Sequence, residues 1–457
     1  MTKPVREHWS SKLGFILAAV GSAIGLGVLW KFPYVVGQNG GGLFLLAYII
    51  CILLIGIPVL IAELMIGRES QRAAVGAFQV LGKKEGSSWR IAGWFGVLSS
   101  FLIMSFYSVI AGWGMSYILM SLSGFYKNLS AAEVSNVYET LASSGGISVF
   151  WHFIFTTVTM GIVLSGVRKG IEKWAKVMTR ALFVILAGLF CYCVGLSGFS
   201  EACRFIFQPN VANFHFSTLL EALGLAFFTL SLGQGIMISY GSYMKKDSNI
   251  PQMAGIVSLA VIAVSILAAL TIFPVVFSFG FTPQEGPGLI FKTLPFLFGK
   301  LPASLIVSTV FFMLFVFTAL TSSIPFIEVV ATNLMELFGW RRKKAVLIVA
   351  LGTFMFGIPC ALAGARSIFP NWEAIYRYNF LDTIDHLVSD WIIPVGGFLT
   401  ALFVGWVADK SIVSRAFKPG SRLGQLWLFF MRYIVPVLIL LIIFQKSGII
   451  DFDKFLT

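Results

Sequence analysis

The sequence GSAIGLG occupies residues 21–27, in the middle of the first apolar run of the chain, which extends from Leu13 to Val36. A run of this length can cross a bilayer, because a membrane-spanning helix needs about 20 apolar residues. Three glycines at its centre disfavour a continuous helix. Irregular backbone is tolerated at membrane depth only where it lines a cavity enclosed by protein. The stretch therefore predicts a broken helix whose exposed N–H and C=O groups form a binding site near the middle of the membrane.

The composition indicates a membrane protein that crosses the bilayer many times. The chain has 457 residues, of which 58% are hydrophobic and 12% are charged, whereas soluble proteins carry about 25% charged residues. No polar stretch is long enough for a soluble domain, so we expect one transmembrane domain over residues 1–457. The first apolar run is longer than the core of a cleaved signal peptide, which has about 7–15 residues. We therefore expect this run to be a membrane span and not a cleaved signal.

The net charge of +13 is explained by topology and not by a nucleic-acid partner. The basic residues gather in alternate loops, at positions 3–12, 68–90, 168–180, 245–246, 341–344 and 410–422. Cytoplasmic loops of membrane proteins carry an excess of Lys and Arg. The pattern therefore predicts a multi-pass protein of the cell membrane with a cytoplasmic N-terminus.

Hydropathy and loop charge together predict eleven membrane spans. An odd number of spans places the C-terminus outside the cell. We expect the spans at residues 11–38, 42–67, 91–122, 148–166, 174–198, 215–244, 253–280, 302–338, 345–364, 381–409 and 424–446.

A second interruption, FFTLSLGQG at residues 227–235, lies in the sixth span. Broken helices at corresponding positions of two halves are typical of transporters built from inverted repeats. The pattern predicts a repeat of five plus five spans, over about 11–198 and 215–409, with an extra helix over about 424–446. The alternative is that these glycines only let helices pack closely, as small residues do in membranes.

The eighth span carries several hydroxyls, among them Thr318, Thr321 and Ser322. Their oxygens suit a hard cation, and a monovalent ion fits better than Ca²⁺ because Ca²⁺ recruits several carboxylates. The alternative is that each hydroxyl bonds back to its own helix.

Ionisable residues within membrane spans are functional candidates by default. Lys31 follows the first break, and Asp385 lies near the predicted outer end of the tenth span, so the two form a candidate gate pair. Glu63 is a candidate buried carboxyl group in the second span, and Tyr107 places a phenol inside the third. No histidine lies near the hydroxyl-rich breaks and no HExxH pattern occurs, so we do not expect an enzyme.

Taken together, these segments resemble the neurotransmitter:sodium symporter family, especially its bacterial amino-acid transporters. The resemblance implies the all-α LeuT fold, an inverted repeat of five plus five helices with helices 1 and 6 broken. It covers nearly the whole chain, in order. The segments that carry it are REHW (6–9), GSAIGLGVLWKFP (21–33), NGGGLFLLAY (39–48), GIPVLIAELMIGR (56–68), FFTLSLGQG (227–235), SYGSYMKKD (239–247), GPGLIFKTLP (286–295) and ALTSSIPFIE (319–328).

The resemblance implies a substrate site between the two breaks. The carboxylate of an amino acid would meet the backbone of Leu26 and Gly27 and the Tyr107 hydroxyl, and Gly25 leaves room for that carboxylate. The amine would meet the carbonyls of Ala23, Phe228 and Thr229 with the Ser231 hydroxyl. The pocket for the side chain would comprise Ile103, Phe228, Gln234, Ser322 and Phe326.

The resemblance also implies a sodium site and two gates. The family's second sodium site would use the carbonyls of Gly21, Ile24 and Thr318 and the hydroxyls of Thr321 and Ser322. The outer gate would pair Lys31 with Asp385. The inner gate would pair Arg6 with Glu336, with Trp9 packed beside it.

Two departures from the family pattern predict fewer ions. The first sodium site of the family uses an asparagine where this chain has Val28, and its ligand in the seventh span corresponds to Val261. The valine side chain offers no oxygen to a cation. A sodium ion buried without enough ligands would cost several kcal/mol, so we expect one sodium ion, at the second site. Tyr48 and Ser265 match chloride ligands of the family, but chloride binding is not expected, because Leu225 stands where the family has a glutamine.

These observations predict a sodium-coupled symporter of an amino acid that works by alternating access, as a monomer or a weak homodimer in the lipid bilayer. Two alternatives remain open. One is a sodium-independent or proton-coupled transporter of an amino acid or amine, and the other is a sensor that binds an amino acid without transporting it.

Overall fold

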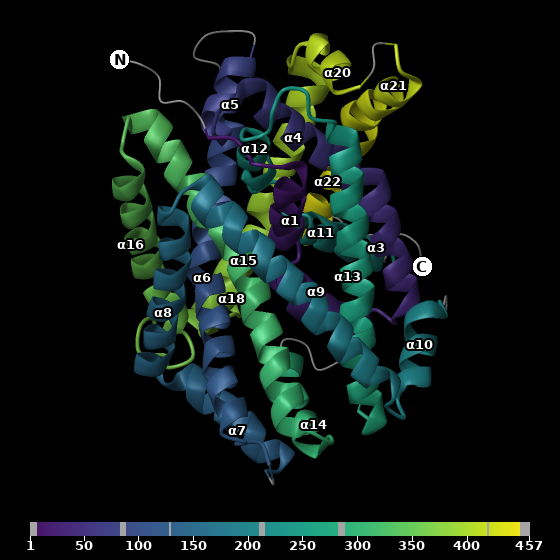
Figure 1. Cartoon of the computed structure of the whole chain (residues 1–457), viewed down its shortest axis with the longest axis vertical. Coiled ribbons are helices and arrows are strands. Elements are labelled where there is room, and N and C mark those ends of the chain that lie inside the picture. The colour runs from purple at the N-terminus through teal and green to yellow at the C-terminus, as the bar shows by residue number, and fades with distance from the viewer. Residues whose placement is uncertain are drawn as a thin grey trace.

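The computed structural model describes residues 7–82, 88–127, 129–209, 215–281, 288–417 and 420–447, and within these ranges the secondary structure is entirely helical. Figure 1 shows long helices running between two ends of the molecule. The short helices α7, α10 and α14 gather at one end, and α5, α20 and α21 gather at the other. Helices α5, α20 and α21 lie in or next to the basic segments 68–90 and 410–422. These two basic segments therefore lie at the same end of the molecule, as the charge pattern predicts.

The first five predicted spans correspond to helices that are divided in places by short π-helical turns, labelled η. Their elements are α1 (Lys12–Ala23), η1 (Gly27–Lys31), α2 (Phe32–Gln38), α3 (Gly42–Cys51), η2 (Ile52–Gly56), α4 (Ile57–Ser70), α6 (Arg90–Leu122), α8 (Gly145–Leu164), η3 (Val167–Glu172) and α9 (Lys173–Val194). The connecting helices are α5 (Ala74–Leu81), α7 (Ala131–Ser143) and α10 (Phe199–Phe207).

The remaining six predicted spans also correspond to helices, some of which are divided by π-helical turns. Their elements are α11 (Phe216–Thr229), α12 (Ile236–Gly241), α13 (Ile250–Ser278), α15 (Ser304–Phe338), α16 (Arg342–Ala361), α18 (Phe380–His386), η6 (Leu387–Ile392), α19 (Ile393–Leu402), η7 (Phe403–Val407), α21 (Arg422–Phe429), η8 (Phe430–Ile434) and α22 (Val435–Lys446). The connecting elements are η5 (Leu289–Thr293), α14 (Leu294–Lys300), α17 (Trp372–Tyr376) and α20 (Lys410–Ala416).

The described residues contain 9 helices that are long and apolar enough to cross a membrane. The number is 10 if α1 and the bent continuation η1–α2 are counted together as one span. The two halves of that pair meet at an angle of 45°. The predicted sixth span is present as α11 and α12, neither of which is long enough to cross alone. Both predicted breaks are therefore confirmed, and the residue limits of the two repeats stay a prediction.

The break in the sixth span is built from residues with left-handed backbone. Ser231, Gly233 and Gly235 have φ angles of 55°, 72° and 70°, a region that glycine enters without steric cost. A Cβ atom at Gly233 would collide with the Ile393 carbonyl of α19 and lie 3.1 Å from the Gly397 amide. The break is thus held in place by direct contact between two backbones.

The long helix α15 lies at the centre of the molecule. It packs against α6, α8, α9 and α16, and also against α1 and α12 at the two breaks. Figure 1 shows α15 running between α6 and α9. Its buried hydroxyls are therefore placed where the broken helices expose their backbone.

We expect Gly233→Ala to destabilise the protein more than Gly420→Ala does. Both glycines have a φ of 72°, so each substitution costs about 1–2 kcal/mol in backbone strain. Only Gly233 has a backbone neighbour in the way, since a Cβ atom at Gly420 meets nothing within 4 Å. Thermal unfolding of the two purified variants measures the difference, and equal shifts in Tm would contradict the backbone contact with α19.

Candidate functional site

Hydroxyls from α15 and from the break in the sixth span bind the backbone at the end of α1. The Ser322 hydroxyl of α15 lies 2.8 Å from the Ser22 carbonyl and 3.3 Å from the Gly21 carbonyl. The Ser231 hydroxyl, from the break in the sixth span, donates to the same Ser22 carbonyl at 3.2 Å. The two breaks and α15 thus meet at one carbonyl oxygen, and the hydroxyl expected to bind the substrate amine contacts α1 in this structure.

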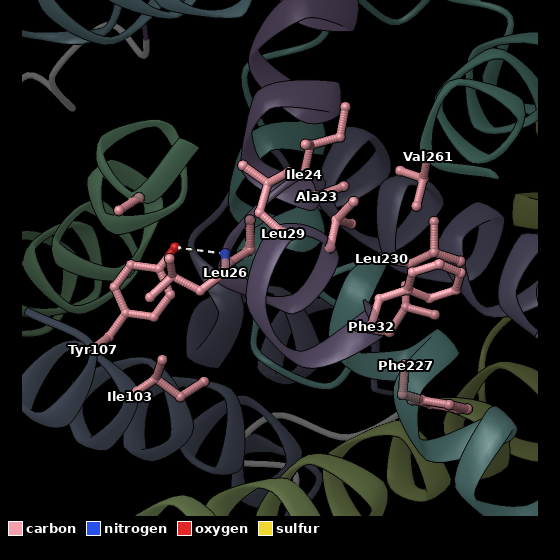
Figure 2. Close-up of a cluster of buried hydrophobic side chains, with 14 of the residues drawn as sticks. Ala23, Ile24, Leu26, Leu29, Phe32, Ile103, Tyr107, Phe227, Leu230 and Val261 are labelled. Carbon is pink, nitrogen blue, oxygen red and sulfur yellow. Dashed lines mark hydrogen bonds between the residues drawn. The ribbon is translucent and has the colours of Figure 1, made fainter. Parts of the chain in front are cut away.

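The phenol of Tyr107 binds the first break from α6. Its oxygen accepts a hydrogen bond from the Leu26 N–H at 3.1 Å, and Figure 2 shows the ring reaching this amide with Ile103 nearby on the same helix. A Cβ atom at Gly25 would lie 2.6 Å from the Ser322 Oγ and 3.2 Å from the Tyr107 hydroxyl. A side chain at Gly25 would displace the Ser322 hydroxyl, and the Leu26 amide and the Tyr107 hydroxyl are groups that can donate to a carboxylate.

The remaining candidates for the substrate pocket lie close to this point. The ring of Tyr107 packs edge-on against Phe326, with 5.5 Å between centroids. A Cβ atom at Gly27 would lie 2.7 Å from the Phe228 ring and 3.4 Å from Thr229. The carbonyl of Gln234 accepts a hydrogen bond from Ser100 at 2.7 Å. The structure also places Ile103, Gln234 and Phe326 in the buried interior.

The oxygens predicted for the second sodium site also lie together. The Thr321 hydroxyl is 2.9 Å from the Thr318 carbonyl, and the Ser322 hydroxyl is 3.3 Å from the Gly21 carbonyl. A Cβ atom at Gly21 would lie 3.2 Å from that of Thr321, and Ile24 ends the same helix. Neutral oxygens of α1 and α15 therefore lie close to one another, and such oxygens suit a hard monovalent cation.

The position of the first sodium site is apolar. Val28 and Val261 have no exposed surface, and Figure 2 shows Val261 beside Leu230 in a cluster of buried hydrophobic side chains, across the broken helix from Tyr107. The Thr229 hydroxyl donates to the Leu225 carbonyl of its own helix at 2.9 Å. The side-chain oxygen that remains here is therefore already bonded.

The residues matched to the family's chloride ligands contact one another. The Tyr48 hydroxyl lies 2.8 Å from Thr229 Oγ1 and 3.3 Å from Ser265 Oγ. Leu225, in place of the expected glutamine, is buried beside them in the same apolar core. Each of these hydroxyls therefore has a hydrogen-bond partner within the protein.

Lys31 and Asp385, the candidate outer gate, lie within ion-pair distance. The Lys31 ammonium is 3.4 Å from the Asp385 carboxylate and 3.3 Å from the Ser389 hydroxyl. It also lies over the ring of Phe228, 5.0 Å from the centroid. About a fifth of each charged side chain is exposed, so the pair stands between the pocket and solvent.

The candidate inner gate is described only in part, because Arg6 lies outside the described residues. The Glu336 carboxylate accepts a hydrogen bond from the Ala73 N–H, before α5, at 2.9 Å. The Trp9 indole donates a hydrogen bond to the Tyr240 carbonyl at 3.0 Å and packs edge-on against the phenol ring of Tyr240. Trp9 thus ties the start of the chain to α12.

A buried ion pair at the basic end of the molecule was missed from the sequence. Glu328 of α15 has no exposed surface, accepts two hydrogen bonds from Arg342 at 2.5 and 3.2 Å, and accepts a third from the Tyr243 hydroxyl at 2.6 Å. A carboxylate within a long apolar span, followed by a basic turn, was the available signal. The pair joins α15 and α16 to the segment after α12.

We expect Glu328→Gln to destabilise the protein by about 3–5 kcal/mol, because it leaves the Arg342 charge without its partner. The double variant Glu328→Gln with Arg342→Met removes both charges and restores most of that loss. As a control, Arg366→Gln breaks the exposed pair with Glu373, whose side chains are 69% and 50% exposed, and costs about 0–1 kcal/mol. Thermal unfolding tests all three, and equal losses for the buried and exposed pairs would contradict this assignment.

Known proteins are similar to this chain over nearly its whole length. The chain is 38% identical over 457 residues to an uncharacterised sodium-dependent transporter of Bacillus subtilis, covering 98% of this chain and 99% of that one. It is 34% identical over 463 residues to another from Methanocaldococcus jannaschii, covering 97% and 91%.

A crystal structure of MhsT in complex with L-phenylalanine superposes with a TM-score of 0.89 at 39% identity, covering 97% of this chain and all of that one. The model of the sodium:neurotransmitter symporter family matches residues 6–144 and 125–454. The chain therefore belongs to the sodium:neurotransmitter symporter family and has its LeuT fold.

Proposed function

We propose that the chain is a symporter that couples the inward movement of sodium to the uptake of an amino acid by alternating access. The observation that carries the proposal is the position of Ser322. Its hydroxyl lies 3.3 Å from the Gly21 carbonyl, in the sodium ligand set, and 2.6 Å from where a Cβ atom of Gly25 would stand, beside Tyr107. One side chain therefore borders both the ion site and the substrate site.

This shared border explains how ion and substrate are coupled. Sodium draws α1 and α15 together, and the substrate needs the same closed arrangement around Leu26 and Tyr107. Two ligands that favour the same state raise each other's affinity equally. The glycines of the two breaks give the broken helices room to change their backbone angles.

We propose that a single sodium ion is bound, at the site formed by Gly21, Ile24, Thr318, Thr321 and Ser322, and that chloride is not needed. The apolar surroundings of Val28 and Val261 support this. The hydrogen bonds that Tyr48 makes to Thr229 and Ser265 support a mechanism without chloride.

For the substrate we propose an amino acid with a small or polar side chain. MhsT was crystallised with L-phenylalanine, which supports an amino acid as the class, and Gly25 keeps the space for its carboxylate. The buried amide of Gln234 supports a polar group on the substrate, because a buried amide needs hydrogen-bond partners. In the cell membrane we place the N-terminus in the cytoplasm and the C-terminus outside.

The direct test is uptake of labelled amino acids into proteoliposomes under an inward sodium gradient, with potassium replacing sodium, or with a proton gradient alone. We expect accumulation only with sodium, without cooperativity in sodium concentration. Accumulation driven by protons alone would move the coupling to that ion. Binding without accumulation would indicate a sensor.

Thr321→Ala should raise the sodium concentration for half-maximal uptake about tenfold or more, because a contact to a charged group contributes about 1.5–3 kcal/mol. The matched control is Thr318→Val, which keeps the ligand carbonyl and removes a hydroxyl that donates to Leu314. Titration of uptake against sodium measures both variants. Equal effects, or none, would show that sodium is not bound at this site.

Tyr107→Phe should weaken amino-acid binding by about tenfold, since it removes a hydrogen bond to a charged carboxylate. The control is Tyr117→Phe on the same helix, whose hydroxyl donates to the Phe291 carbonyl at 2.7 Å, away from the breaks. Competition between labelled and unlabelled amino acids gives the affinities. An unchanged affinity in Tyr107→Phe would remove the phenol from the substrate site.

A further inference from the structure

Glu63 of α4 is a buried carboxyl group that neither the sodium site nor the substrate site uses. Its side chain has no exposed surface. One oxygen, Oε1, accepts a hydrogen bond from the Gly233 N–H at 2.7 Å. Within the described part of the chain, the other oxygen, Oε2, has no hydrogen-bond partner.

Among the residues that the structure describes, no positive charge compensates this carboxyl group. The elements packed against α4 are α5, α12, α13, α19, α20, η2 and η8. Among them α5, α13, α19 and η2 carry no titratable side chain. The titratable groups on the others are Tyr240 on α12, Lys410 and Arg415 on α20, and Arg432 and Tyr433 on η8, and α4 itself adds Arg68 and Glu69.

These groups are engaged with other partners or exposed. Arg415 and Arg68 both contact Glu69, at 2.7 and 2.6 Å. Arg432 donates to the Gly405 carbonyl. Tyr240 packs against Trp9, Tyr433 packs against Trp406, and Lys410 is exposed. Across the described residues, no cation lies within ion-pair distance of Glu63, and a carboxylate buried without a partner charge is strongly disfavoured.

Glu63 is also hydrogen-bonded to the break of the sixth span, whose backbone angles change in the proposed transport cycle. Gly233, its hydrogen-bond donor, lies inside the break of the sixth span with a φ of 72°. A Cβ atom at Gly396 of α19 would lie 2.5 Å from the Gly233 carbonyl. The Gly233 backbone thus lies between Glu63 and α19, and a separation of the break from α19 would let water reach the region beside Glu63.

We propose that Glu63 is a proton-binding site of the transport cycle. It carries a proton on Oε2 while the break is closed against α19, and it passes that proton to water when the break opens. Only the O–H bond is broken, and a carboxylate remains until it is protonated again. This inference rests on the proposed function, since a proton that moves with the cycle requires a transporter.

The first test is infrared spectroscopy of the purified protein, which needs no substrate. At neutral pH we expect the carbonyl band of a protonated carboxylic acid in the wild type and its loss in Glu63→Gln. The matched control is the double variant Glu328→Gln with Arg342→Met, which keeps most of its stability, because Glu328 is equally buried but paired with Arg342. A wild type without the acid band, or a band that persists in Glu63→Gln, would overturn the proposal.

The second test follows protons in proteoliposomes that contain the pH dye pyranine, with an equimolar mixture of neutral L-amino acids and a sodium gradient. We expect a pH change that accompanies uptake by the wild type and falls in Glu63→Gln to the level of vesicles without protein. Sodium-driven uptake with no pH change, or with an equal change in Glu63→Gln, would refute proton exchange at Glu63. No sodium-driven uptake at all would instead refute the proposed function, and the infrared result would still decide whether Glu63 binds a proton.

Discussion

The structure depends on how the backbone groups released at the two broken helices find hydrogen-bond partners. No water is present in the bilayer core to bond them, and each unpaired group costs several kcal/mol. The Leu26 amide therefore binds Tyr107, the Ser22 carbonyl binds Ser322, and the Gly233 amide binds Glu63. The three partners come from α6, α15 and α4, so the breaks fix how these helices are arranged around them.

The same hydrogen bonds prepare the protein to bind its ligands. In the proposed cycle, a substrate carboxylate accepts hydrogen bonds from the Leu26 amide and the Tyr107 hydroxyl, and a cation binds the Gly21 carbonyl that Ser322 now contacts. Each ligand replaces contacts within the protein by stronger contacts to a charge. Such a ligand shifts the protein toward the state in which those groups converge, because only a difference in affinity between two states moves their equilibrium.

Much of this arrangement follows from local sequence, because glycines in an apolar run and hydroxyls in a long span mark positions where backbone leaves the helix. The spans, both breaks and the pairing of Lys31 with Asp385 were predicted in this way. The partner of Ser231 was not, because an amine and the Ser22 carbonyl suit the same hydroxyl equally well. The pairing of Glu328 with Arg342 was also missed, because two helices choose their contact by packing, which a single sequence does not reveal.

Charge balance within the membrane links the departures from the family pattern to one another. An ion at the first sodium site would place a second positive charge close to the first, and the family's chloride ligands lie where an anion would offset it. In this chain Val28 and Val261 remove the oxygens for the cation, and Leu225 removes a ligand for the anion. The remaining hydroxyls of Tyr48, Thr229 and Ser265 bond to each other. In the proposed one-sodium mechanism, losing both ions together removes one positive and one negative charge, whereas losing either one alone would leave the other ion's charge without its partner.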